Sequence, residues 1–206
     1  MIECLVDIMC NLVVVKNRKI YKSLNLTNFM DIHKKIVKVI DYELEYVEAL
    51  GYINRPVYHV RKNNIDYILK AFDYTQSWER RHIDIEKEVL EMSKDVEGIT
   101  HLVKDYGVIK NEHIAILKEY AEGQEISYVT KINKDKFKKQ LKNTINDLHD
   151  LGVARLDVEE RNIIISPSGI AKIIDLGNCK FKRNLNKHEF NAEITTDFED
   201  LKSIFE

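Results

Sequence analysis

Two acidic residues and one amide between residues 151 and 178 have the types and spacing that phosphoryl transfer requires. Asp157 is followed by Asn162 and then by Asp175. Asn162 opens an apolar run and Asp175 ends a second one after a Ser-Pro-Ser-Gly turn, so the sequence predicts a β-hairpin over 162–175. The two side chains then stand at its two ends and can converge on one point. Amide and carboxylate oxygens suit Mg²⁺, and Asp157, on the preceding loop, can face a substrate hydroxyl.

The order Asp-x-x-x-x-Asn followed by Asp-x-Gly resembles the catalytic loop and the magnesium loop of the protein-kinase superfamily. The resemblance implies that Asp157 is catalytic, that Asn162 and Asp175 bind metal, and that the cofactors are ATP and Mg²⁺. Without the resemblance, the same stretch reads as an acidic loop before an ordinary hairpin.

A strand lysine and a helix glutamate upstream fit the same family. Residues 65–72 alternate like a strand and carry Lys70 at the position that holds ATP phosphates in the family. Residues 83–92 follow with helical spacing. The resemblance implies that Glu86 of this helix orients Lys70, with Glu88 as the alternative. The apolar residues expected on one face of the helix are Ile85, Val89 and Met92.

The remaining nucleotide contacts come from two connections. Residues 50–60 resemble a glycine-rich loop that runs into a second strand, which implies that Gly51 and Val57 contact the nucleotide. Residues 119–125 resemble the hinge between the lobes of a kinase. There the C=O of Glu119 and the N–H of Ala121 would face adenine, and Lys118 would stand at the back of the pocket, where the family usually has an apolar residue.

Several residues depart from the family pattern. The glycine-rich loop retains only Gly51 and carries Pro56 near the place of a later glycine. Leu156 replaces the arginine expected before Asp157, and Glu159 replaces a lysine. These departures favour an alternative, a pseudokinase-like module that binds nucleotide or a partner. Asp197 nevertheless resembles the aspartate whose helix anchors the catalytic loop.

The resemblance implies an α+β protein with a two-lobed protein-kinase-like fold, a β-rich N-lobe and a shortened helical C-lobe. We expect an N-terminal extension over 1–41, formed by a hairpin and a helix, an N-lobe over 42–120 and a minimal C-lobe over 121–206. The short C-lobe is similar to atypical kinases: the RIO family, the kinase subunit of the KEOPS tRNA-modification complex and the lipopolysaccharide-core kinases. The expected function is ATP- and Mg-dependent phosphoryl transfer of the serine/threonine or autophosphorylating type. Small-molecule kinase activity is the further alternative.

The first 50 residues leave two assignments open. Residues 12–24 read as a hairpin, and a helix capped by Asn28 or Asp31 follows. Residues 42–46 fit either a first strand or an extension of that helix, and we favour the strand. The helix is expected to bury Ile32, Ile36, Val39 and Ile40.

A rival register takes Lys22 as the phosphate lysine, with Glu43 or Glu45 as its partner. Residues 67–73 would then form the hinge, as in aminoglycoside-kinase-like proteins. A short similarity also links Ile-Leu-Lys at 68–70 with Ile-Leu-Lys at 116–118, which we interpret as two hairpins of similar chemistry.

Composition fits a globular domain, with 44% hydrophobic and 32% charged residues. The net charge of −2 gives no general attraction to nucleic acid. No run reaches the ~18 apolar residues of a membrane span. Three cysteines without metal-ligand spacing predict a reducing, cytoplasmic environment. The acceptor of the phosphoryl group, a protein partner or a small molecule, is not specified by the sequence.

Overall fold

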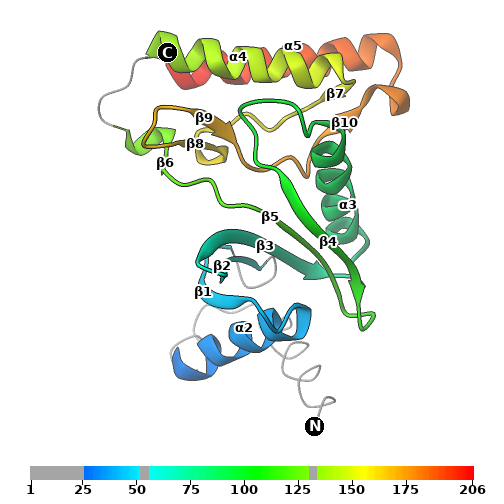
Figure 1. The fold of residues 1–206 in the computed structure, drawn as a ribbon. Helices are drawn as coiled ribbons and strands as arrows, with labels where there is room; N and C mark the ends of the chain where they lie inside the picture. Colours follow the sequence, from blue (N-terminus) through cyan, green and yellow to red (C-terminus); the bar gives the residue numbers. More distant parts are fainter. Residues whose placement is uncertain (1–25, 52–55, 130–133) are drawn as a thin grey trace, which may run out of the picture.

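The computed structural model describes residues 26–51, 56–129 and 134–206. Their main elements, in chain order (Figure 1), are α2 (Leu26–Ile40), β1 (Glu45–Ala49), β2 (Val57–Lys62), β3 (Ile65–Asp73), α3 (Ser77–Met92), β4 (Leu102–Ile109), β5 (His113–Glu119), β6 (Gln124–Glu125), α4 (Lys134–Asp150), β7 (Val153–Ala154), β8 (Ile163–Ile165), β9 (Ala171–Ile173), β10 (Lys180–Phe181) and α5 (Lys187–Phe205).

Five strands form an antiparallel sheet in the order β1-β2-β3-β5-β4. The β2–β3 hairpin turns at Asn63 and Asn64, which have left-handed φ values of 53° and 62°. Asparagine tolerates this conformation, so the pair suits a tight two-residue turn. Because β3 is paired with β2 on one side and β5 on the other, residues 67–73 lie inside a central strand. The rival register that placed a hinge there is therefore wrong.

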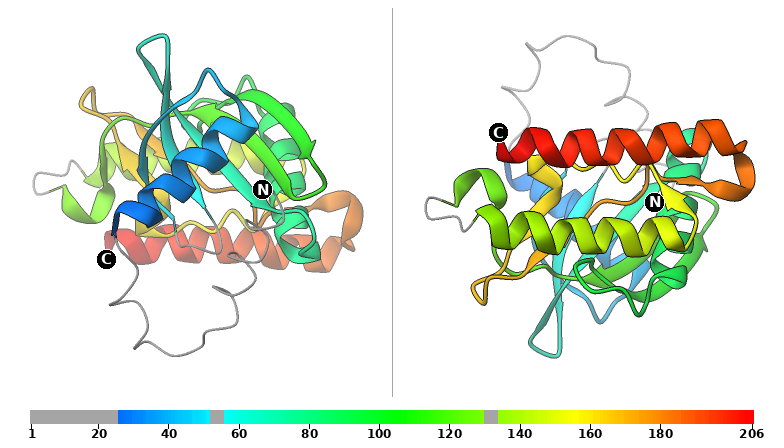
Figure 2. Two further views of the ribbon diagram at one scale, coloured as in Figure 1. Left: turned by 90° about the horizontal axis from the view of Figure 1, so that it is seen from below. Right: turned by 90° about the horizontal axis from the view of Figure 1, so that it is seen from above.

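Helix α2 packs on one face of this sheet (Figures 1 and 2). Ile36, Val37 and Ile40 are buried there against strand residues. Val39, expected on the buried face, is instead 42% exposed, because Val37 takes the inward position one half-turn away. The helix ends at Ile40 and the strand begins at Glu45, so the helical extension is wrong, and the strand expected over 42–46 starts three residues later than predicted. The hairpin predicted over 12–24 lies outside the described residues.

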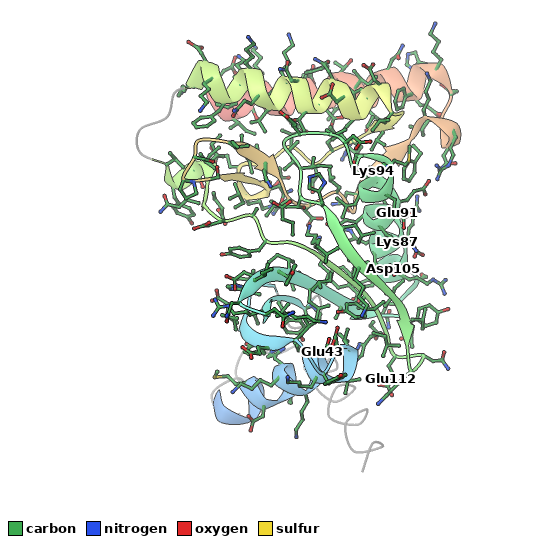
Figure 3. The ribbon with its side chains drawn as sticks, viewed as in Figure 1. Glu43, Lys87, Glu91, Lys94, Asp105 and Glu112 are labelled. Carbon is green, nitrogen blue, oxygen red and sulfur yellow. The ribbon has the colours of Figure 1, made fainter. Side chains whose placement is uncertain are left out.

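Helix α3 packs on the opposite face of the sheet. Ile83 joins Phe72, Ile114 and Ile116 in a buried cluster. Met92, predicted on the buried side, is exposed, whereas the charged Glu86 is buried on α3. Apolar spacing thus placed Val89 and Ile85 correctly but not Met92, and it missed Glu86. At the sheet edge, Lys87 of α3 and Asp105 of β4 form an ion pair of 3.1 Å, and both are labelled in Figure 3.

The C-terminal part contains the two long helices α4 and α5, which run side by side (Figures 1 and 2). Between them and the sheet lies the predicted hairpin, with β8 paired to β9 and a turn over 166–169. Asn186 and Glu189 form a capping box that starts α5. The protein is thus α+β. Within the described ranges, no helix combines the length and apolar character that crossing a bilayer requires.

Candidate active site

Lys70 and Glu86 form a buried ion pair between β3 and α3. Lys70 Nζ donates to Glu86 Oε2 at 2.6 Å. Glu86 is fully buried, and Lys70 is nearly so. Burial lowers the pKa of Lys70, but the carboxylates of Glu86 and Asp175 more than offset this and raise it above its ordinary value. Glu88, the alternative partner in the sequence prediction, instead pairs with Arg183 at the surface.

Asp175 completes this cluster from the segment that follows β9. Its Oδ1 accepts from Lys70 Nζ at 3.0 Å and lies 3.4 Å from His82 Nε2. Burial would raise the pKa of Asp175, but Lys70, His82 and Lys118 hold it well below its usual range. Its side chain keeps 34% of its surface exposed, so it can reach a ligand. Gly177 lets the loop pass close to His82, because a Cβ there would lie 2.1 Å from His82 Nε2.

Lys118 also belongs to the cluster, whereas the resemblance implied only a place at the back of a pocket. Its Nζ donates to Glu86 Oε1 at 2.6 Å and to the carbonyl oxygen of Ile174. It is only 2% exposed. Burial lowers the pKa of Lys118, and the attraction of Glu86 offsets this only in part. The signal that could have revealed this role is the repeated Ile-Leu-Lys, since its two lysines lie on adjacent strands.

Asp157 lies on a loop that faces the segment after Asp175. Asn178 Nδ2 donates to Asp157 Oδ2 at 3.0 Å, and Asn162 Nδ2 donates to the carbonyl oxygen of Asp157 at 2.9 Å. The carbonyl oxygen of Asn162 in turn accepts the N–H of Ile174 at 3.0 Å. These bonds bring the predicted catalytic aspartate, the predicted amide ligand and the start of the predicted magnesium loop together.

Asp197 of α5 holds the loop that carries Asp157. It is fully buried and accepts the N–H groups of Arg155 at 3.0 Å and Leu156 at 2.7 Å. His149 Nε2 lies 2.8 Å from Oδ2, the same oxygen that accepts the N–H of Arg155. Arg155 and Asp157 have left-handed φ values of 59° and 54°, which non-glycine residues adopt at a cost. The predicted anchoring role of Asp197 is therefore confirmed by these contacts.

The residues predicted to contact nucleotide lie at two places, around the start of β2 and around the end of β5. Val57 stands opposite Lys70 in the β2–β3 register. The N–H of Gly51 donates to the carbonyl oxygen of Val57 at 3.3 Å. Residues 52–55 between them lie outside the described ranges. Glu119 ends β5, and Ala121 follows in the connection to β6. Glu119 and Ala121 line a cavity of about 450 Å³ together with residues of the β8–β9 hairpin.

Among the described residues, one group of side chains in the cluster has the spacing of metal ligands. His82, Glu86 and Asp175 bring ligand atoms within 4.8 Å of one another. However, the ammonium groups of Lys70 and Lys118 already occupy Glu86. The carboxylate of Asp175 and the amide oxygen of Asn162 are the donors that suit Mg²⁺. A metal role for Asn162 and Asp175 thus stays a prediction that their chemistry fits.

The basic run over 180–187 is engaged with acidic groups. Lys180 donates to Glu193 at 2.5 Å, and Arg183 reaches Glu88 through both of its terminal nitrogens. Neighbouring Cys179 is buried, and burial raises the pKa of its thiol. The run therefore carries less free positive charge than the sequence implied.

Similarity to curated proteins points to protein kinases. The chain is 30% identical over 118 residues to mitogen-activated protein kinase kinase kinase 4 of Homo sapiens, covering 53% of this chain and 7% of that protein. It is 42% identical over 55 residues to the probable serine/threonine-protein kinase KKQ8 of Candida glabrata, covering 26% and 7%. It is 30% identical over 77 residues to the serine/threonine-protein kinase HAL5 of the same yeast, covering 37% and 10%.

The matches thus span at most a tenth of these relatives' own lengths. No protein-family model matches the chain. The partial homology supports a protein-kinase-like relationship.

Proposed function

We propose that this chain is an ATP- and Mg²⁺-dependent phosphotransferase with a two-lobed kinase-like fold of the atypical, minimal type. The observation that carries the proposal is the buried Lys70–Glu86 pair, whose lysine also contacts Asp175. Burying an ammonium group is costly unless a carboxylate fixes it, so a lysine held this way has a defined orientation. A fixed positive charge beside a partly exposed carboxylate fits triphosphate and its metal.

Each residue then has one part in the reaction. Lys70 holds phosphate oxygens, and Glu86 orients Lys70. Asn162 and Asp175 would hold Mg²⁺, which would neutralise phosphate charge. The bond between the γ-phosphorus and its bridging oxygen breaks, leaving ADP. A bond forms to the hydroxyl oxygen of the acceptor, and its proton passes to the carboxylate of Asp157.

We propose that the acceptor is a serine or threonine hydroxyl, either of this chain or of a partner. The homology to serine/threonine kinases supports this choice. A small molecule bearing a hydroxyl is the alternative acceptor. The division into lobes at about residue 120, the RIO-, KEOPS-kinase- or lipopolysaccharide-kinase-like type and a cytoplasmic location stay predictions.

A nucleotide-binding module without catalysis is the second candidate function. Glu159 favours it, because this carboxylate stands two residues after Asp157, where the resemblance implies a positive charge. The guanidinium group of Arg161 lies 2.7 Å from the carboxylate of Glu159, but this ion pair is exposed at the surface. In this alternative, Lys70 and Asp175 bind nucleotide, but the protein transfers no phosphoryl group.

The test uses γ-radiolabelled ATP with Mg²⁺, with and without a cell extract. Wild type should label itself or an acceptor, and MgATP should raise its melting temperature because a ligand of the folded state stabilises it. Asp157→Asn should lose most transfer but keep the thermal shift, whereas Asp175→Asn should lose both. Asp150→Asn, an exposed aspartate at the end of α4, is the matched control. Equal labelling by wild type and Asp157→Asn would reject the enzyme, and no thermal shift in wild type would reject nucleotide binding as well.

A further inference from the structure

The family pattern requires one lysine for ATP binding, Lys70, but the buried cluster contains a second lysine, Lys118. Lys70 sits opposite Ile116 and Lys118 sits opposite Ile68 in the antiparallel β3–β5 register. Residues paired in this way share a face of the sheet, so the two lysines point to the same side. There they meet one carboxylate, with Lys70 on Oε2 and Lys118 on Oε1 of Glu86.

The second contact of Lys118 reaches the magnesium loop. Its Nζ also donates to the carbonyl oxygen of Ile174, the residue directly before Asp175. One side chain on β5 therefore joins α3 to the segment after β9. A lysine placed only to fill the back of a pocket would not need both partners, and Lys118 itself is almost fully buried.

Charge balance gives these bonds a consequence for ligand binding. The two lysines face the two carboxylates of Glu86 and Asp175, with His82 beside Asp175. When Lys70 moves toward the phosphates of ATP, Glu86 still has Lys118 as a second cationic partner. Without Lys118, the buried carboxylate of Glu86 is paired with Lys70 alone, so any movement of Lys70 toward ATP leaves a buried charge less well compensated.

We propose that Lys118 is a positioning residue for phosphoryl transfer, which keeps Glu86 and the segment before Asp175 in place while Lys70 engages ATP. The inference rests on the proposed function. Lys118 acts through Glu86 and through the carbonyl group of Ile174 rather than on the reacting atoms. Its removal should therefore change how well the other residues work rather than which reaction occurs.

A double-mutant cycle tests this inference. MgATP affinity by titration calorimetry and kcat by radiolabel transfer are measured for wild type, Lys118→Met, Glu86→Gln and the double variant. Methionine keeps the length and apolar stem of the side chain but leaves the Glu86 and Ile174 oxygens without this donor. We expect Lys118→Met to weaken MgATP binding about tenfold, because Glu86 and the segment before Asp175 are then no longer held in place by this donor. In the Glu86→Gln background the same change should cost less than about threefold, because the carboxylate it serves is gone.

Two controls separate the possible outcomes. Lys104→Met, on the exposed side of β4, should match wild type, and Lys70→Met should lose MgATP binding. Absence of MgATP binding by wild type would overturn the proposed function and this inference together. Binding that Lys70→Met abolishes but Lys118→Met leaves unchanged would overturn this inference alone, as would equal losses in both Glu86 backgrounds. If Lys118→Met does not fold, Lys118→Gln, which keeps an amide donor, enters the same cycle.

Discussion

Replacing Asp197 tests whether one buried carboxylate holds the loop that carries Asp157. Its two oxygens accept the backbone N–H groups of Arg155 and Leu156 and lie next to His149. Alanine at this position removes all three contacts and leaves a space on α5. Asparagine keeps the size and one oxygen but replaces the other by an amide nitrogen, which cannot accept.

The expected loss of stability follows from these three contacts. A buried donor left without an acceptor costs about 1–3 kcal/mol, so three give roughly 3–9 kcal/mol as an upper range. Part is recovered, because Arg155 and Asp157 can then leave their left-handed conformations, which cost of the order of 1–3 kcal/mol each. We therefore expect Asp197→Ala to lower the free energy of unfolding by about 3–5 kcal/mol, and Asp197→Asn by about half as much. A typical domain has only ~5–15 kcal/mol in total.

Urea unfolding, followed by circular dichroism, measures this change. Glu199→Ala is the matched control, since it lies two residues away on the exposed side of the same helix. Exposed substitutions of this kind usually stay within about 0.5 kcal/mol. A loss below about 1 kcal/mol for Asp197→Ala, or one equal to that of Glu199→Ala, would refute the reasoning. Asp197→Asn should also reduce phosphoryl transfer more than MgATP affinity, because the loop it holds carries Asp157 rather than the phosphate lysine.

Two further predictions concern the cluster and the sheet. Gly177→Ala should lower the free energy of unfolding by about 1–3 kcal/mol in urea, because its Cβ would overlap the buried ring of His82; a loss below 0.5 kcal/mol would contradict this. Burial lowers the pKa of His113 despite nearby Glu112 and Asp73. Between this lowered pKa and the unfolded value of about 6.5, His113 binds more protons in the unfolded chain than in the folded one. The contribution of neutral His113 to the free energy of unfolding is therefore fully present above pH 6.5 and is lost as the pH falls below it. His113→Gln should reduce this loss between pH 7.5 and 5.5, and parallel curves for both proteins would argue against it.

Local patterns predicted the elements that carry the site. The 162–175 hairpin follows from two apolar runs around a Pro-Gly turn, and the lysine strand follows from alternation. The helix with Glu86 was also found, with Val89 and Ile85 of its inner face, but Glu86 itself was not expected on that face. Glu86 is itself on that face because Lys70 and Lys118 satisfy its charge, and a rule that counts only apolar residues misses such a position.

The contacts between distant elements could not be read from the sequence. The pairing of β3 with β5 sets which residues of two separate hairpins stand opposite each other, and this register decides that Lys118 meets Glu86. The sequence instead marked Lys118 as a departure from an apolar position. His82 was missed for the same reason, because its contact with Asp175 joins residues 93 positions apart. Periodicity also predicted an apolar face on α2 but gave no information on which side of the sheet it covers.

One departure from the family pattern finds a physical counterpart in the structure. Leu156 stands where the resemblance implies an arginine that would bind an activating phosphate, and it is buried in the core below the helices. The helix with Glu86 is held by other means, since Arg183 binds Glu88 through both terminal nitrogens and stacks over Phe181 at 4.2 Å. A bidentate arginine–carboxylate pair fixes direction as well as distance. The pair of Arg183 with Glu88 thus adds a surface contact to the buried packing of Ile83 that holds α3 against the sheet.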